Sequence, residues 1–274
     1  MVTRRDYTAE AVDGALSVLV ELTHLLGEYR ENIVLIGGWV PDFLFPGVDP
    51  PHVGSMDIDL ALDHTKITEA GYETIANLLT ERGYRPGDQP YKFYRTIESG
   101  GTKVEVEVDL LAGEYEGTGR GRRHQRVQDI KARKARGCDL AFDMFEEISV
   151  TGTLPGGGKD TVTLRVASVV SFLVMKGMAL EDRIKEKDAW DIYHCLRSYP
   201  GGLVALIAEI KPHISNNLVR EGFEKIGTKF ASIEHIGPQW VANFDEIDDS
   251  EERDLRVRDA FERVDYLLRG LGLR

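Results

Sequence analysis

The sequence predicts an α+β protein, with a small mixed sheet and its helices first and a helical bundle after it. Short apolar or alternating runs, which are typical of strands, lie before residue 167. Turns that contain glycine or proline separate these runs. From Ala167 onward, apolar residues recur at helical spacing instead. We therefore expect two domains, at residues 1–166 and 167–274.

The first elements follow from a capping residue and from the length of the apolar runs. Thr8 can cap a helix over residues 8–29, whose apolar residues repeat at helical spacing. The next apolar run, residues 32–36, is short and predicts a buried strand. Gly37 and Gly38 then turn the chain into a short helix, and a loop rich in proline and glycine follows.

Alternation of apolar and polar residues predicts the next strand, at residues 57–62. A helix capped by Thr65 or Thr68 follows it and runs to Arg82. The other expected elements are strands near 91–98 and 103–111, a helix over 125–135, a hairpin of strands 144–152 and 160–166, and helices at 168–180, 183–198, 201–210, 215–227 and 250–270.

The composition indicates an ordinary globular protein. The chain has 274 residues, of which 42% are hydrophobic and 29% charged. No apolar run approaches the roughly 20 residues that span a membrane, and the N-terminus lacks an apolar signal core, so we expect no membrane partner and a cytoplasmic location. The two cysteines, Cys138 and Cys195, have no motif spacing, which predicts neither a disulfide framework nor a zinc site.

Charge is unevenly distributed along the chain. The net charge of −12 argues against a general nucleic-acid coat protein. Residues 120–136 nevertheless contain eight Lys or Arg and one acid, whereas residues 245–254 contain seven acids. The basic segment predicts a local anionic partner, and the alternative is a solvated helix that balances the protein's own acids. The candidate RNA contacts are Arg120, Arg122, Arg123, Arg126, Lys131, Arg133 and Lys134.

Three aspartates are the leading candidates for chemistry. Asp57 and Asp59 alternate with apolar residues, and side chains at i and i+2 of a strand share a face, roughly 6–7 Å apart. A second alternating run, residues 104–111, contributes Asp109. Carboxylates held in this way can bind Mg²⁺, the ion that accompanies nucleoside triphosphates. The alternative is a merely solvated strand face.

The glycine pair before these acids predicts a phosphate contact. Without side chains, Gly37 and Gly38 can bring backbone N–H groups, at the start of the following helix, close to phosphate oxygens.

Two motifs resemble known families. Gly37-Gly38, followed by Ser55-x-Asp57-Ile58-Asp59 and a later strand acid, is similar to the DNA polymerase β-like nucleotidyltransferase superfamily. In the second half, Lys176-x-x-Ala179-x-x-x-Arg183 and then Lys187-Asp188-x-x-Asp191-Ile192-Tyr193 resemble the AbiEii-type abortive-infection toxins, a family that includes the MenT-type toxins that modify tRNA. The family often carries a basic residue before the Ser/Thr-x-Asp-x-Asp string, and Val53 and Gly54 stand there instead.

The resemblance implies a Mg²⁺-dependent nucleotidyltransferase domain and assigns roles to the motif residues. Asp57, Asp59 and Asp109 would bind the metal, and Lys176 and Asp188 would complete the catalytic set. The nucleotide-binding residues would be Gly37, Gly38, Ser55 and Lys176. Two other interpretations stay open: in one, Lys176 extends to the surface, and in the other, Asp188 belongs to an ion-pair network, the role we favour for Asp191.

The expected function is transfer of a nucleoside monophosphate from a nucleoside triphosphate to RNA, tRNA in particular. The resemblance implies the toxin of a type IV-like toxin–antitoxin or phage-defence system, with a cognate antitoxin as partner. One alternative is an antibiotic nucleotidyltransferase, because Trp39 and Asp42, after the glycine pair, resemble residues of that class of enzyme. The acidic residues of 245–254 would then face a cationic acceptor. The other is a non-catalytic module, which would bind triphosphate without releasing pyrophosphate.

Overall fold

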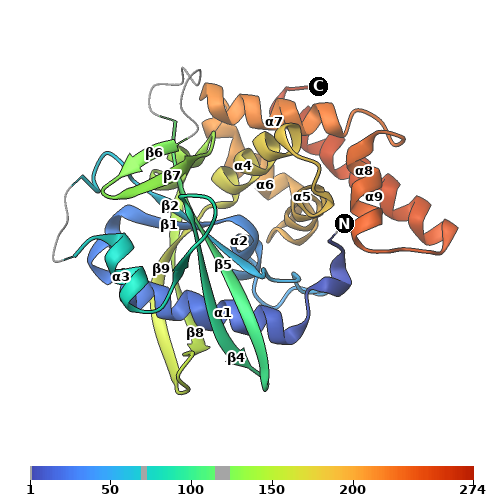
Figure 1. The fold of residues 1–274 in the computed structure, drawn as a ribbon. Coiled ribbons are helices and arrows are strands. Elements are labelled where there is room, and N and C mark those ends of the chain that lie inside the picture. The colour runs from blue at the N-terminus through green and yellow to red at the C-terminus, as the bar shows by residue number, and fades with distance from the viewer. Residues whose placement is uncertain (1, 69–72, 115–123) are drawn as a thin grey trace. The chain divides into compact units, whose positions relative to one another are not determined.

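The computed structural model describes residues 2–68, 73–114 and 124–274, and divides the chain into two compact units (Figure 1). The sheet unit comprises Tyr7–Phe43 and Gly54–Ser168. The helical unit comprises Met1–Asp6, Leu44–Val53 and Val169–Arg274. A mixed sheet and several helices are present, which agrees with the expected α+β class.

One mixed sheet forms the sheet unit. Its strand order is β3-β4-β5-β2-β1-β9-β8, and β7 pairs with β5 and with β6. The pairs β2–β5, β1–β9 and β5–β7 are parallel, and the other pairs are antiparallel. The strands are β1 (Ile33–Ile36), β2 (Asp57–Leu62), β3 (Arg85–Pro86), β4 (Lys92–Ser99), β5 (Thr102–Ala112), β6 (His124–Val127), β7 (Ile130–Lys134), β8 (Phe145–Thr153) and β9 (Lys159–Ala167).

Helix α1 (Ala9–Leu25) covers one face of this sheet. Thr8 caps it as predicted, accepting a hydrogen bond from the backbone N–H of Ala11 at 3.3 Å. Gly14 lies so close to β5 that a Cβ there would come within 3.1 Å of Val104. The buried Glu21 accepts hydrogen bonds from Arg95 of β4, at 2.9 Å, and from other donors. Because strand side chains alternate, the aspartates of β2 and β5 lie on the opposite face.

The helix predicted to start at Thr65 or Thr68 is shorter and starts later. Helix α3 (Ile75–Glu81) is capped by Thr74. Thr65 instead donates its hydroxyl and its backbone N–H to Asp63, at 2.6 and 3.1 Å, which closes a turn. The other short elements are η1 (Arg4–Asp6), η2 (Gly27–Asn32), η3 (Gly37–Trp39), α2 (Val40–Leu44) and η5 (Cys138–Phe142).

The expected helix over residues 125–135 is wrong, because this segment forms the antiparallel hairpin β6–β7. Burial alternates along it: Ile130 and Ala132 are buried, whereas Lys131 and Arg133 are exposed. That two-residue period fits a strand, and β7 also extends the sheet beside β5. The local helical propensity of the Lys, Arg and Ala residues is overridden by this pairing.

The helical unit contains the five helices that the sequence predicts after residue 167. These are α4 (Val169–Asp182), α5 (Glu186–Ser198), α6 (Gly202–Ile210), α7 (Asn217–Lys229) and α9 (Ser250–Leu271). Two further elements were not expected, η6 (Lys211–His213) and α8 (Ile236–Phe244). Gly237-Pro238 in the first turn of α8 is typical of a loop, which hides this helix in the sequence.

Close backbone approach explains two glycines in this unit. A Cβ on Gly177 of α4 would come within 2.2 Å of the carbonyl oxygen of Gly222 in α7. Residues without side chains are therefore needed where these helices meet. Across the described part of the chain, no helix has both the length and the apolar character that a membrane crossing requires.

Candidate functional site

The three predicted aspartates lie on one face of the sheet. Asp57 and Asp59 belong to β2, Asp109 belongs to β5, and these two strands are neighbours. Asp59 pairs in register with Asp109, and Asp57 pairs with Glu107. Neighbouring strands are about 4.8 Å apart, and residues paired in register project to the same side. The register therefore brings together four carboxylates at the start of β2 and the middle of β5. They belong to Asp57, Asp59, Glu107 and Asp109, and we call this group the acidic face.

Gly37 packs directly against this acidic face. It follows Ile36, which pairs with Asp59 across β1 and β2. Its φ is +75°, a conformation that favours glycine, and a Cβ there would lie 2.0 Å from Oδ2 of Asp59. Gly38 is buried in the turn that follows. Glycine at position 37 is thus required both by the backbone and by the aspartate beside it.

Burial strongly affects the carboxyl group of Asp109. Its side chain is only 12% exposed and lies 3.4 Å from Nζ of Lys92. Burial raises the pKa of Asp109 to about 6; the charge of Lys92 opposes this increase, and those of Glu107 and Asp57 add to it. A carboxyl group with such a pKa can exchange a proton near neutral pH, and a bound cation would favour its ionised form.

Neighbouring residues fix the positions of the other acids. The buried Ser55 donates its hydroxyl to Oδ1 of Asp57. Lys92 forms an ion pair with Glu107, whose other oxygen accepts a hydrogen bond from the Tyr94 hydroxyl at 3.1 Å. Burial lowers the pKa of Lys92, but the hydrogen bond and the acids around it outweigh burial and raise it.

Glu107, Lys92 and Tyr94 also contribute to this site, although none of them was predicted from the sequence. Glu107 had a local signal, because it lies two residues before Asp109 on an alternating strand. Lys92 and Tyr94 had none. They reach the acids only because β4 pairs antiparallel with β5, with Lys92 opposite Asp109.

The acidic face has the donor chemistry of a Mg²⁺ site. Carboxylate oxygens are the ligands that Mg²⁺ prefers. Within residues 2–68, 73–114 and 124–274, no group of three or more His, Cys, Asp or Glu side chains is arranged so that it could hold a metal ion. Mg²⁺ usually takes only one or two protein carboxylates, and water and substrate phosphates complete its coordination.

Lys176 and Asp188 meet in a buried ion cluster of the helical unit. Nζ of Lys176, on α4, lies 2.6 Å from Oδ1 of Asp188 and 2.7 Å from Oδ2 of Asp191, both on α5. Arg183, the exposed member, contacts Asp188 at 2.8 Å. The side chain of Lys176 is 9% exposed. Burial would lower the pKa of Lys176, but the two carboxylates outweigh it and raise it.

Asp191 is the centre of this ion cluster. It also accepts from Lys187 at 2.9 Å and contacts Nε2 of His52 at 3.0 Å. Burial opposes ionisation of Asp191, yet the adjacent lysines hold its pKa well below the usual range. For His52, burial and then the charge of Lys187 lower the pKa to about 3, so the ring is neutral. These contacts join α4, α5 and the segment that carries His52.

The structure therefore groups the predicted residues in two sets. Asp57, Asp59, Asp109, Gly37, Gly38 and Ser55 lie together in the sheet unit, and Lys176 lies with Asp188 in the helical unit. A direct contact of Lys176 with a triphosphate stays a prediction.

The structure describes the basic segment, residues 120–136, only in part and the acidic run, residues 245–254, completely. Arg120, Arg122 and Arg123 lie outside the described residues, whereas Arg126, Lys131 and Arg133 are exposed on β6–β7 and Lys134 is half-buried there. In the acidic run, the half-buried Asp245 accepts a hydrogen bond from Trp190 Nε1 at 2.9 Å, and Asp249 caps α9. Part of that run is therefore committed to the helical unit itself.

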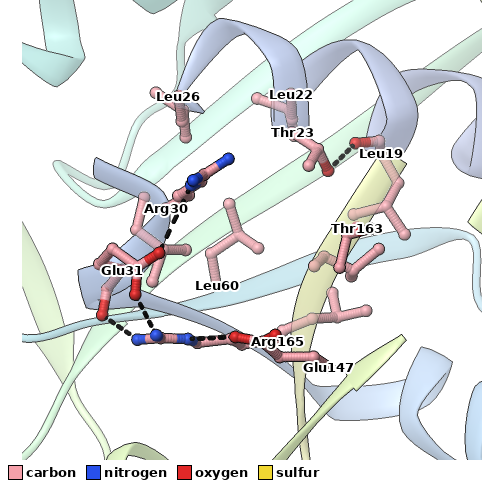
Figure 2. Close-up of a pocket in the computed structure, with 13 residues that line it drawn as sticks. Leu19, Leu22, Thr23, Leu26, Arg30, Glu31, Leu60, Glu147, Thr163 and Arg165 are labelled. Carbon is pink, nitrogen blue, oxygen red and sulfur yellow. Dashed lines mark hydrogen bonds and ion pairs between the residues drawn. The ribbon is translucent and has the colours of Figure 1, made fainter. Parts of the chain in front are cut away.

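A cavity of about 220 Å³ lies between α1 and the sheet, on the face away from the aspartates (Figure 2). Leucines of α1 and Leu60 of β2 form its apolar wall. Arg165 and Glu31 pair at its edge, and Leu60 points between them and α1. None of the predicted site residues lines it.

None of the protein-family models matches the chain, and no curated protein matches it either.

Proposed function

We propose that this protein is a Mg²⁺-dependent nucleotidyltransferase that moves a nucleoside monophosphate from a nucleoside triphosphate to an RNA acceptor. The observation that carries the proposal is the register of β2 and β5, which sets Asp59 beside Asp109 and next to the tight turn at Gly37. An acidic strand face beside a glycine turn is suited to holding a metal-bound triphosphate.

In the proposed reaction, an acceptor hydroxyl attacks the α-phosphorus, and pyrophosphate leaves. Asp57, Asp59 and Asp109 would hold Mg²⁺, which neutralises phosphate charge when bound. The Ser55 hydroxyl fixes the carboxylate of Asp57 for this role. With Mg²⁺ bound, Asp109 would stay ionised, so this carboxylate could receive the proton of the attacking hydroxyl. The backbone at Gly37 and Gly38 would approach the phosphates.

The helical unit would contribute through its ion cluster. Asp188 holds both Lys176 and the exposed Arg183, so it can position a guanidinium at the surface while Lys176 balances its charge. We propose that Asp188 and Lys176 are positioning residues. A stronger form of this hypothesis is that Lys176 contacts the triphosphate directly. Kinetics of Lys176→Met and Arg183→Gln separate these forms. If Lys176 only positions Arg183 through Asp188, both variants should raise the KM for triphosphate, whereas a direct contact predicts that only Lys176→Met raises it.

The choice of RNA as acceptor rests on the basic hairpin β6–β7, because Arg126, Lys131 and Arg133 are exposed on it. A tRNA acceptor, a role as the toxin of a toxin–antitoxin or phage-defence system, a cognate antitoxin and a cytoplasmic location are proposals that rest on the resemblance of the two motifs.

A transfer assay tests the proposal. The protein is incubated with Mg²⁺ and each nucleoside triphosphate labelled at the α-phosphate, together with total RNA or with an aminoglycoside. We expect label in RNA and release of pyrophosphate. Label in the aminoglycoside would indicate the antibiotic-modifying alternative. Triphosphate binding without pyrophosphate release would indicate a non-catalytic module and contradict the proposal.

A further inference from the structure

Three planar side chains gather where the hairpin β6–β7 meets the start of β4. Tyr91 immediately precedes β4, and its ring centroid lies 5.7 Å from that of His124 on β6, with 34° between the planes. The guanidinium carbon of Arg133, on β7, lies 6.0 Å from the Tyr91 ring centroid. Tyr91 and His124 are half-buried and Arg133 is exposed. We call these three residues the aromatic cluster.

Strand register places the aromatic cluster next to the acidic face. Lys92, the neighbour of Tyr91, pairs with Asp109. Two residues further along β5, Leu111 pairs with Arg133. Since residues at i and i+2 of a strand project to the same side, Arg133 lies on the face of the sheet that carries Asp109. A ligand on the aromatic cluster would therefore lie within a few residues' length of the three aspartates.

The hairpin adds positive charge on the same side. Arg126 pairs with Lys131 and His124 pairs with Arg133, so these four side chains project to one face of β6–β7. Arg126, Lys131 and Arg133 are exposed. On the other face, Val127, Ile130 and Ala132 are buried. The cluster is thus bordered by cations, in a chain whose net charge is −12.

We propose that the aromatic cluster is a stacking subsite for a nucleobase of the substrate at the acidic face. Nucleobases stack on aromatic rings and on Arg guanidinium planes, and flanking cations contact the adjacent phosphates. The combination fits single-stranded nucleic acid or a nucleotide better than a duplex, whose bases are already stacked. The base would stack on the ring of Tyr91, beside His124 and Arg133. This inference deepens the proposed function and rests on it.

Two substrates could supply the base: the nucleoside triphosphate or the RNA acceptor. Steady-state kinetics of Tyr91→Leu and Arg133→Gln distinguish them. We expect a rise of about 10-fold or more in one KM, with the other changed less. A rise in the KM for RNA assigns the base to the acceptor, and a rise in the KM for triphosphate assigns it to the nucleotide. Tyr91→Phe keeps the ring and should behave as wild type.

Matched controls and a binding measurement complete the test. Tyr266→Leu and Arg220→Gln remove an exposed tyrosine and an exposed arginine elsewhere, and should leave both KM values unchanged. Binding of labelled single-stranded oligonucleotides and of triphosphate, measured by anisotropy and by equilibrium dialysis, needs no turnover. If wild type catalyses no transfer but binding weakens about 10-fold in Tyr91→Leu, the proposed function fails and the subsite stands. Unchanged binding and KM values in folded Tyr91→Leu and Arg133→Gln would overturn the subsite, whatever the fate of the proposed function.

Discussion

Asp109→Asn should make the protein more stable and less able to bind Mg²⁺. The folded protein holds the pKa of Asp109 at about 6, against an ordinary value of 3.8. Each pKa unit corresponds to about 1.36 kcal/mol, so the ionised side chain costs the folded state about 3 kcal/mol at pH 7. Asn has nearly the same shape as Asp and no charge. In EDTA, we therefore expect the free energy of unfolding of Asp109→Asn to exceed that of wild type by up to this amount.

The pH dependence of this difference checks its origin. Because the folded-state pKa is raised, wild type loses stability relative to the variant as pH rises from about 4 to about 6, and the difference is full above pH 6. Urea unfolding in EDTA at pH 7, 5 and 4 measures it, with the exposed Glu98→Gln as a matched carboxylate control. Mg²⁺ should raise the Tm of wild type and not of Asp109→Asn. A variant that is less stable than wild type at pH 7 in EDTA would refute the reasoning.

Three further predictions follow from geometry and charge. Gly37→Ala should lower transfer activity at least 10-fold, because the added Cβ would lie 2.0 Å from Oδ2 of Asp59. Gly47, with a φ of +77°, has open space around it, so Gly47→Ala should lower the free energy of unfolding by only the backbone cost, about 1 kcal/mol. The folded protein holds the pKa of His52 at about 3, so as pH falls below 6.5 this side chain takes up a proton only in the unfolded chain. Between pH 7 and 5 the free energy of unfolding of wild type should therefore fall by about 2 kcal/mol more than that of His52→Gln. Equal decreases in the two proteins would contradict this. Replacing Arg126 and Lys131 by Gln should reduce the slope of log K for RNA against log salt by about 0.7 per residue, and an unchanged slope would remove the hairpin from the RNA contact.

Local patterns suffice to predict much of the sheet unit. Alternation predicts β2 and β5, and with them the positions of Asp57, Asp59 and Asp109 on strands. Alternation does not predict the strand register, which places Lys92 opposite Asp109. The hairpin β6–β7 shows the reverse failure, since its pairing with β5 overrides a local sequence that favours helix.

The helical unit shows a second limit of sequence reasoning. The sequence predicts an ion-pair network as one role for Asp188 and the favoured role for Asp191, and the structure places both in one buried cluster. Lys176, which the sequence does not assign to this network, also belongs to this cluster. The contribution of His52 is invisible in the sequence, because it comes from a segment, Leu44–Val53, more than 100 residues away that belongs to the helical unit. Non-contiguous units of this kind have no local signal.

Pyrophosphate release by Asp59→Asn tests the central claim most directly. The claim is that the carboxylates of the acidic face hold the metal for nucleotidyl transfer, and Asn keeps the shape of Asp59 while removing its charge. With Mg²⁺, triphosphate and RNA, the account predicts release by wild type and a loss of at least 100-fold in Asp59→Asn, with an unchanged circular dichroism spectrum and no loss of Tm in EDTA. Release within a fewfold of wild type by the folded variant would contradict the account.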